Sequence, residues 1–297
     1  MSDRTDPECN RKELEEVTEA SDFRPLPAAT GTPMAHLRSE TPAVFRRTAS
    51  DWPAVSTWTF RHIASLAPSL RVQLVKGNRE KDHTAFTEST LGEYLDSLTG
   101  ESPDGDDLTY LKEFDLLKRF PGLRGDLRHE QMFPRGSVTS CSTWIGPALA
   151  RTGLHHDLLD NLAVQITGRK RFYLARPGTV ERAGALSAKY DAWARLSRVG
   201  IAELAAAHAP ATSDAFFAVD LEPGDVLYVP ARWWHEVVNL SAGILLSGFF
   251  GSTMRVTSLW ARVRLRDTLH RAGLLSPGNC TCHADRRGAQ HRWGGTP

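Results

Sequence analysis

The chain has 297 residues, of which 41% are hydrophobic and 24% are charged, the usual mixture of a globular protein. Lys and Arg together number 36 and Asp and Glu 35, so the formal net charge is +1. A chain this neutral is a poor candidate for dedicated nucleic-acid binding, which needs many cations against phosphate. The sequence contains neither a signal peptide nor an apolar stretch of membrane-spanning length. We therefore expect a cytoplasmic protein with neither a nucleic acid nor a membrane as partner.

The charge is distributed unevenly along the chain. Residues 1–40 carry 5 basic and 9 acidic side chains, whereas residues 255–297 carry 8 basic and 2 acidic ones. The first segment has few large apolar groups to bury, so it is predicted to be an acidic, disordered tail with a short helix over residues 13–20. The globular part is expected to cover residues 41–254.

The pattern over residues 41–136 is mixed and predicts an N-terminal α/β part. Some apolar groups recur at helical spacing, and others alternate as they do in a strand. A Pro-Gly pair at 121–122 ends the last of these elements. The predicted elements are helices over 58–66, 91–98 and 110–120, and a strand over 70–75.

From residue 137 onward, short apolar runs are separated by turn residues. Such spacing is typical of a β-sandwich or barrel, so residues 137–254 are predicted to be mainly β. The expected strands cover 138–145, 162–166, 170–175, 216–221, 225–229, 236–240 and 243–250. An Ala-rich stretch over 187–208 and an amphipathic stretch over 256–275 are predicted as helices.

The first candidate site lies in Thr-Gly-Leu-His-His-Asp at residues 152–157. If the chain is extended there, His155 and Asp157 point to the same face, because side chains in a strand alternate. An imidazole and a carboxylate at this spacing can form two corners of a metal coordination shell. Taken alone, the pair is more often a structural contact than a metal site.

The second candidate is His235, which follows the turn and strand Pro-Gly-Asp-Val-Leu-Tyr-Val-Pro at residues 223–230. In a barrel, this return places His235 near the strand that carries His155. Two histidines and one carboxylate form the facial triad typical of non-haem Fe(II). The sequence therefore predicts an iron site at His155, Asp157 and His235.

These motifs, with Trp-Ile-Gly-Pro at 144–147 and Gly-Arg-Lys-Arg at 168–171, resemble the cupin-like JmjC oxygenases. Within that family they most resemble the branch of the asparaginyl hydroxylase that inhibits hypoxia-inducible factor. The resemblance covers residues 41–251. It implies a double-stranded β-helix, a cupin or jelly-roll barrel, with flanking N-terminal and C-terminal helices. It also implies Fe(II) on the triad and 2-oxoglutarate as cosubstrate.

By the same resemblance, Lys170 stands where the family binds the distal carboxylate of 2-oxoglutarate. Tyr110 and Thr152 match positions that hydrogen bond with that carboxylate, and Asn161 matches another polar site residue. Three of these residues have a structural alternative: Lys170 as a surface cation, Tyr110 as a core residue of its predicted helix, and Asn161 as the cap of a loop.

Side chains along residues 161–166 are expected to alternate between the two faces of a strand. Asn161 and Gln165 share one face of the predicted strand, opposite an apolar face, so both are candidates to line a polar cavity, Gln165 as a substrate contact. Trp234 is a candidate wall of the substrate entrance, with packing as the alternative. One position departs from the family, because Phe249 or a neighbour stands where many members have Asn.

The predicted function is a 2-oxoglutarate-dependent hydroxylase that acts on a carbon of an amino-acid side chain in a protein or peptide. The alternatives are a tailoring hydroxylase of a small natural product and a catalytically inactive cupin binding module. Only the departure at Phe249 favours the inactive module. The resemblance also implies a homodimer through the C-terminal helix.

The sequence Cys280-Thr-Cys282-His283 invites a zinc hypothesis. A Cys-x-Cys pair without a second pair at finger spacing is a loose signal. We therefore expect a disordered, polar tail there in preference to a metal site.

Overall fold

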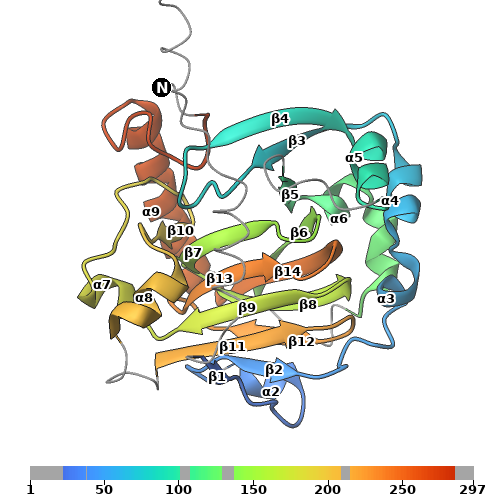
Figure 1. The fold of residues 1–297 in the computed structure, drawn as a ribbon, viewed down its shortest axis with the longest axis horizontal. Coiled ribbons are helices and arrows are strands. Elements are labelled where there is room, and N and C mark those ends of the chain that lie inside the picture. The colour runs from blue at the N-terminus through green and yellow to red at the C-terminus, as the bar shows by residue number, and fades with distance from the viewer. Residues whose placement is uncertain (1–22, 38, 101–107, 129–136, 209–214, 285–297) are drawn as a thin grey trace, which may run out of the picture.

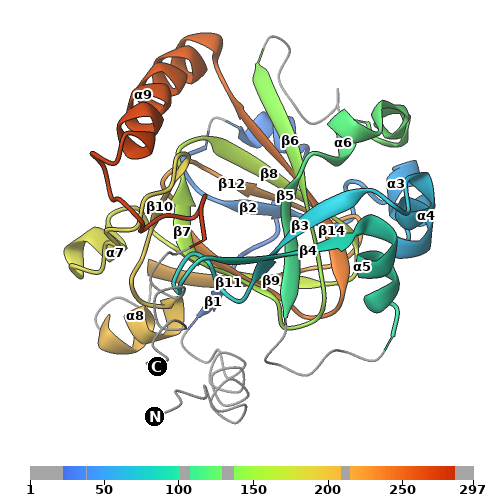
Figure 2. The ribbon, with the colours of Figure 1, turned by 90° about the horizontal axis from the view of Figure 1, so that it is seen from above.

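A computed structural model describes residues 23–37, 39–100, 108–128, 137–208 and 215–284 of the chain. Two mostly antiparallel sheets face each other and enclose a barrel (Figure 1, Figure 2). In these ranges, no helix combines the length and the apolar character that crossing a membrane requires.

One sheet has six strands and the other has eight. The six-stranded sheet runs β1 (Arg24–Pro25), β11 (Phe216–Leu221), β9 (Lys170–Ala175), β13 (Trp234–Asn239), β7 (Arg151–Asp157) and β10 (Ala194–Leu196). The eight-stranded sheet runs β2 (Ala43–Phe45), β12 (Val226–Val229), β8 (Asp160–Thr167), β14 (Gly243–Gly251), β6 (Val138–Gly146), β5 (Thr109–Phe114), β3 (Arg71–Lys76) and β4 (Ala85–Thr90). Four strands of each sheet, β7, β9, β11 and β13 opposite β6, β8, β12 and β14, form a double-stranded β-helix. The predicted mainly β barrel is confirmed.

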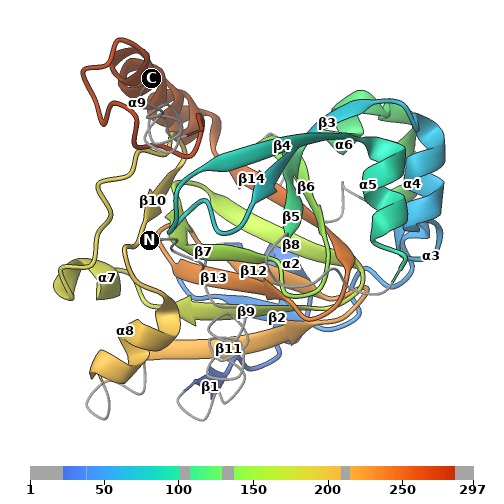
Figure 3. The ribbon, with the colours of Figure 1, turned by 45° about the horizontal axis from the view of Figure 1, so that its top comes forward.

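Helices pack on the outside of both sheets. They are α2 (Pro33–His36), α3 (Pro53–Thr57), α4 (Phe60–Leu66), α5 (Leu91–Ser97), α6 (Leu116–Arg119), a 3₁₀ helix (Pro121–Asp126), α7 (Thr179–Arg182), α8 (Ile201–His208) and α9 (Thr253–Arg271). Helices α3–α6 cover the eight-stranded sheet, and α7 and α8 pack against the six-stranded one. Helix α9 lies on the opposite side of the barrel from α3–α5 (Figure 3).

Strand β8 shows how alternation divides the core. Leu162, Val164 and Ile166 belong to the outer apolar cluster under the helices. Ala163, which points the other way, packs between the sheets with Phe172 of β9. A strand whose side chains alternate in this way directs its odd-numbered polar residues into the barrel, as the sequence predicts for β8.

The helix predicted over residues 110–120 is wrong in its first half. Residues 109–114 form β5, and only Leu116–Arg119 is helical. Tyr110 pairs with Val75 and Leu111 with Ile145, so backbone pairing with two strands overrides the local helical spacing. Glu113 has a φ of 56°, which marks the irregular end of this strand.

Two further expectations need correction. The helix predicted over 187–208 is confined to Ile201–His208, because residues 194–196 form β10 on the edge of β7. The predicted disordered tail is too long, because β1 pairs with β11 and Leu26 is buried in the barrel. The helix expected over residues 13–20 lies outside the described residues.

Two predictions about organisation stay predictions. Strands β2–β5 extend the eight-stranded sheet, so they contact the barrel directly, and no observation tests the boundary placed at residue 136. Helix α9 leaves Trp260 and Leu265 exposed, and no observation tests the homodimer.

Candidate metal and cosubstrate site

Strands β7 and β13 bring the predicted metal ligands together. His155 and His235 are register partners across the two strands, and Asp157 shares their face because it follows His155 by two residues. One ligand atom from each residue lies within 4.8 Å of the other two. The His235 Nε2 lies 3.6 Å from Asp157 Oδ2, and the two imidazole centroids are 4.2 Å apart. The three side chains can therefore share one ion.

Backbone carbonyls orient both imidazoles. The Nδ1 of His155 lies 2.7 Å from Gly153 O, and the Nδ1 of His235 lies 3.1 Å from Trp233 O. A carbonyl oxygen only accepts, so each Nδ1 carries the proton and each Nε2 keeps a free lone pair. Burial, and then the neighbouring His155, lowers the pKa of His235 well below its usual value. Both effects favour a neutral imidazole, which is the form that binds metal.

Asp157 supplies the carboxylate of the group. Burial raises the pKa of Asp157 to about 6. A divalent cation between the three side chains would oppose this effect, because it favours the ionised form of a carboxylate. The donor set of two imidazoles and one carboxylate therefore fits a transition-metal ion such as Fe(II).

Lys170 lies completely buried at the start of β9. Its Nζ donates to the phenol oxygen of Tyr110 at 2.5 Å. Among the described residues, no carboxylate forms an ion pair with it, and burial, followed by the charge of Lys112, lowers the pKa of Lys170 well below its usual value. A buried amine that lacks a counterion is unfavourable, so this position fits an anionic ligand.

The strand register places Lys170 on the same face as the metal-binding residues. Lys170 pairs with Asn239 of β13, four residues after His235. Thr152 and Asn239 lie beside the phenol of Tyr110, and Asn239 Oδ1 is buried without a hydrogen-bond partner in the described part of the chain. Lys170, Tyr110 and Thr152 thus meet as predicted, although Tyr110 comes from a strand and not from a helix.

Comparison with known families gives an independent result. The family described as the cupin-like domain matches residues 29–255. This chain belongs to that family. The match covers the barrel, both motifs of the triad and the strands that carry Lys170 and Tyr110.

Curated relatives of this cupin-like domain include three differently named proteins. Jumonji C domain-containing protein 5 of Drosophila melanogaster is 26% identical over 206 residues, which cover 66% of this chain and 51% of the relative. The HSPB1-associated protein 1 homolog of Danio rerio is 30% identical over 222 residues, 67% of this chain and 49% of the relative. The tRNA wybutosine-synthesizing protein 5 of Homo sapiens is 30% identical over 179 residues, which cover 60% of this chain and 53% of the relative.

The resemblance to cupin-like JmjC domains is confirmed by these matches. Iron and 2-oxoglutarate are expected for the family, whose JmjC members include oxygenases, hydroxylases and demethylases. The chain spans about half the length of the curated relatives it matches.

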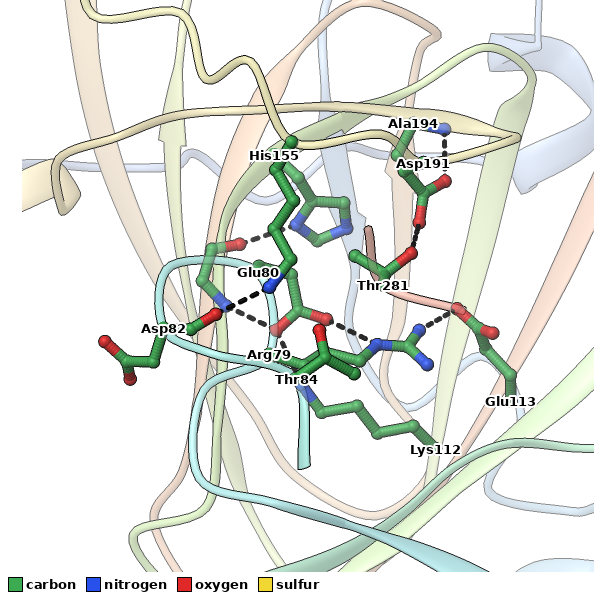
Figure 4. A network of polar contacts seen from close by, with 12 residues as sticks. Arg79, Glu80, Asp82, Thr84, Lys112, Glu113, His155, Asp191, Ala194 and Thr281 are labelled. Atoms are coloured by element: carbon green, nitrogen blue, oxygen red, sulfur yellow. Dashed lines mark hydrogen bonds and ion pairs between the residues drawn. The ribbon is translucent and has the colours of Figure 1, made fainter. Parts of the chain in front are cut away.

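A buried network of ion pairs around Glu80 lies beside the site. The sequence patterns did not predict it. Glu80 Oε2 accepts from Lys112 Nζ at 2.7 Å and from the Gly153 backbone N–H at 3.3 Å, and Glu80 Oε1 accepts from Arg79 Nε at 3.1 Å (Figure 4). Burial alone would raise the pKa of Glu80, but Lys112 and Arg79 lower it to about 2. Buried Lys112 therefore has an acidic partner, in contrast to Lys170.

Asn161 and Gln165 both point into the barrel but lie at different positions along it. The Asn161 amide lies 3.5 Å from Ser247 Oγ, and a hydrogen bond with Asp157 partly opposes the rise that burial causes in the pKa of that carboxyl. Gln165 lies toward the other end of β8, where its amide donates to Thr167 O at 2.8 Å. Its role as a substrate contact stays a prediction. Phe249 is the strand partner of Asn161 in β14. Phe249 has no polar side-chain group, and the polar contact of Asn161 on β14 comes from Ser247, two residues earlier.

The assignment of Trp234 to the substrate entrance is wrong. Its side chain points away from His235 because adjacent residues of β13 face opposite sides of the sheet. The indole is completely buried in the cluster under α7 and α8, its N–H donates to Glu181 at 3.1 Å, and its ring packs edge-on against His156. Trp234 therefore packs on the outside of the barrel.

Proposed function

We propose that this protein is an Fe(II)- and 2-oxoglutarate-dependent oxygenase that hydroxylates a carbon of an amino-acid side chain in a protein or peptide. The observation that carries the proposal is the pairing, on one face of the six-stranded sheet, of a His-Asp-His group with a buried lysine. Among the described residues this lysine has no carboxylate partner. Metal and anion sites on one barrel face suit a ligand that chelates at one end and is negatively charged at the other.

The residues would divide the work in a simple way. His155, Asp157 and His235 would hold Fe(II), while Lys170 and Tyr110 would bind the distal carboxylate of 2-oxoglutarate. When bound, the metal and cosubstrate supply oxidation of an unactivated C–H bond by dioxygen.

The chain itself positions these groups and excludes water. The carbonyls that accept from each Nδ1 hold the two imidazoles in the metal-binding tautomer. Phe172, Leu174 and Val237 belong to the apolar cluster between the sheets, next to Lys170 and His235, and they keep water from the space between the two charged ends. We assign no general base.

A groove at the Asp157 end of the barrel supports a chain-like substrate. It has a volume of about 710 Å³ and is lined in part by Asp160, Arg176, Arg232 and Arg255, and the backbone N–H of Arg232 donates to Asp157 O. The size lies in the usual range for ligand sites, and its mixed charges suit a polar peptide. The relatives' names refer to lysine demethylation and to a tRNA modification, so both are alternatives to be tested.

The test begins with binding under anaerobic conditions. Fe(II) and 2-oxoglutarate together should give a metal-to-ligand absorption band that is absent with either alone and absent in Asp157→Ala. Oxygen should then convert 2-oxoglutarate to succinate, and mass spectrometry of candidate peptides should find a gain of one oxygen atom. Formaldehyde release would indicate demethylation. Absence of both the band and succinate would contradict the oxygenase and favour a binding module.

A further inference from the structure

Four side chains outside the barrel converge near the C-terminal end of the described chain. His270 lies at the end of α9, and Cys280, Cys282 and His283 lie in the segment that follows. One ligand atom from each lies within 4.8 Å of the others. The expectation of a disordered tail is wrong for residues 280–283, because Cys280 and Thr281 are buried and held by hydrogen bonds.

The distances in this cluster match a tetrahedral metal site. The Sγ atoms of Cys280 and Cys282 lie 3.4 and 3.2 Å from Nδ1 of His283, and Cys282 Sγ lies 3.4 Å from Nε2 of His270. Zinc bonds of about 2.3 Å to sulfur and about 2.1 Å to nitrogen place neighbouring ligands roughly 3.6 Å apart. Cys282 Sγ thus lies between two ring nitrogens, and sulfur and imidazole nitrogen are both zinc ligands.

A second observation concerns how His270 is held. Its Nδ1 lies 2.7 Å from Leu275 O, so Nδ1 carries the proton and Nε2 keeps a lone pair directed at Cys282. The ring also stacks on Tyr190, with centroids 4.2 Å apart and planes 19° from parallel. Zinc-bound histidines are typically fixed through the other ring nitrogen in this way. The same arrangement orients His155 and His235 in the barrel.

We propose that His270, Cys280, Cys282 and His283 bind one structural Zn²⁺ ion. Two thiolates and two neutral imidazoles give a complex of zero net charge, which suits a half-buried position. The protein supplies all four ligands, so the site is closed and holds no position for a substrate. The proposal does not depend on the activity of the barrel.

The zinc ion would hold the C-terminal segment against the edge of the barrel. Thr84 Oγ1 donates to Cys280 O at 2.7 Å, and Thr281 Oγ1 donates to Asp191 Oδ2 at 2.5 Å. The other oxygen of Asp191 accepts from the backbone of Ala194 at 2.8 Å, as Figure 4 shows. Ala194 pairs with Asp157 in the sheet. Zinc therefore stabilises the strand edge next to two of the three predicted iron ligands.

Metal analysis of the full chain tests the proposal. The triad is first disabled by combining His155→Ala with Asp157→Ala, so that zinc there does not obscure the result. This chain, reconstituted with Zn²⁺ and freed of excess metal, should keep one zinc ion. Adding Cys282→Ser should remove it, whereas Cys141→Ser, a half-buried cysteine of β6, should not. X-ray absorption should find two sulfur and two nitrogen ligands.

A measurement on the unmodified chain guards against a triad variant that fails to fold. A strong zinc chelator should expose two additional thiols to a thiol reagent and lower the melting temperature, and Cys282→Ser should show neither change. A chain that takes up no zinc on reconstitution with Zn²⁺, and whose two thiols stay reactive in its presence, would overturn the proposal. So would a Cys280–Cys282 disulfide in the purified protein, or full retention of zinc by Cys282→Ser.

Discussion

Two buried lysines beside Tyr110 differ in one respect that matters for function. Lys112 Nζ lies 2.7 Å from Glu80, whereas Lys170 Nζ contacts the Tyr110 phenol and has no acidic partner among the described residues. Paired charges are tolerated in a protein interior. An unpaired charge has the same unfavourable desolvation energy but no attraction to an opposite charge that would offset it. This contrast supports the proposal that Lys170 binds a ligand, whereas Lys112 stabilises the fold.

Lys170→Met should therefore separate binding from stability. The free energy of unfolding without ligand should be unchanged or higher, because an unpaired buried amine is replaced by an apolar group of similar size. The affinity for 2-oxoglutarate in the presence of metal should fall by about 2 kcal/mol or more, roughly thirty-fold. Denaturant unfolding and anaerobic calorimetry measure the two quantities.

Lys112→Met is the matched control for that experiment. It leaves Glu80 buried beside Arg79 alone, and breaking a buried pair costs about 3–5 kcal/mol of stability. An unchanged affinity for 2-oxoglutarate in Lys170→Met would show that Lys170 does not bind the cosubstrate.

Strand β13 carries function on one face and packing on the other. His235 faces the barrel interior with Val237 and Asn239, while Trp234 and Val238 belong to the outer cluster under α8. The alternation of a strand thus places a metal ligand and a large core residue in adjacent positions.

Substitutions on one face should mainly lower stability, and those on the other should mainly weaken iron binding. Trp234→Ala should lower the free energy of unfolding by about 3–5 kcal/mol through the cavity it leaves, with iron affinity unchanged. Trp234→Phe, which loses the hydrogen bond to Glu181, is the milder variant if the first does not fold. His235→Ala should abolish iron binding with a smaller loss of stability. Calorimetry and metal titration compare them, and loss of iron binding in Trp234→Phe would contradict this division.

At the scale of the molecule, the barrel gathers the candidate site from strands of both sheets. The triad comes from β7 and β13, Lys170 from β9 and Tyr110 from β5. A ligand that contacts both the metal and Lys170 therefore links several strands. Such a ligand should stabilise the whole fold, because it binds the native state and not the unfolded chain.

Thermal unfolding should show this coupling directly. Under anaerobic conditions, 2-oxoglutarate should raise the melting temperature only when Fe(II) is present. At about 100 times its dissociation constant the stabilisation is about 2.7 kcal/mol, which corresponds to a shift of several degrees in a chain of this size. The Asp157→Ala variant should show no shift. An equal shift without metal would mean that the two ligands bind independently.

The sequence by itself determined most of the barrel and the triad. The alternation of apolar residues and the turns between them identify the strands of the barrel, and His155 and Asp157 share a face because two-residue spacing fixes it. The family resemblance, carried by contiguous motifs, located Lys170 and Thr152. Except for His235, these features depend on residues close together in the chain, so the local pattern is enough to specify them. His235 lies in a separate motif, and the expected return of the barrel places it near the other two ligands.

Only the tertiary structure decided the surroundings of several other residues. Tyr110 lies in a strand because two other strands pair with its backbone, and Trp234 is a packing residue because α7 and α8 cover it. The ion pair of Glu80 with Lys112 and the convergence of His270 with Cys280, Cys282 and His283 join segments that no periodicity relates. Burial and pairing are properties of the packed chain, and a local pattern does not contain them.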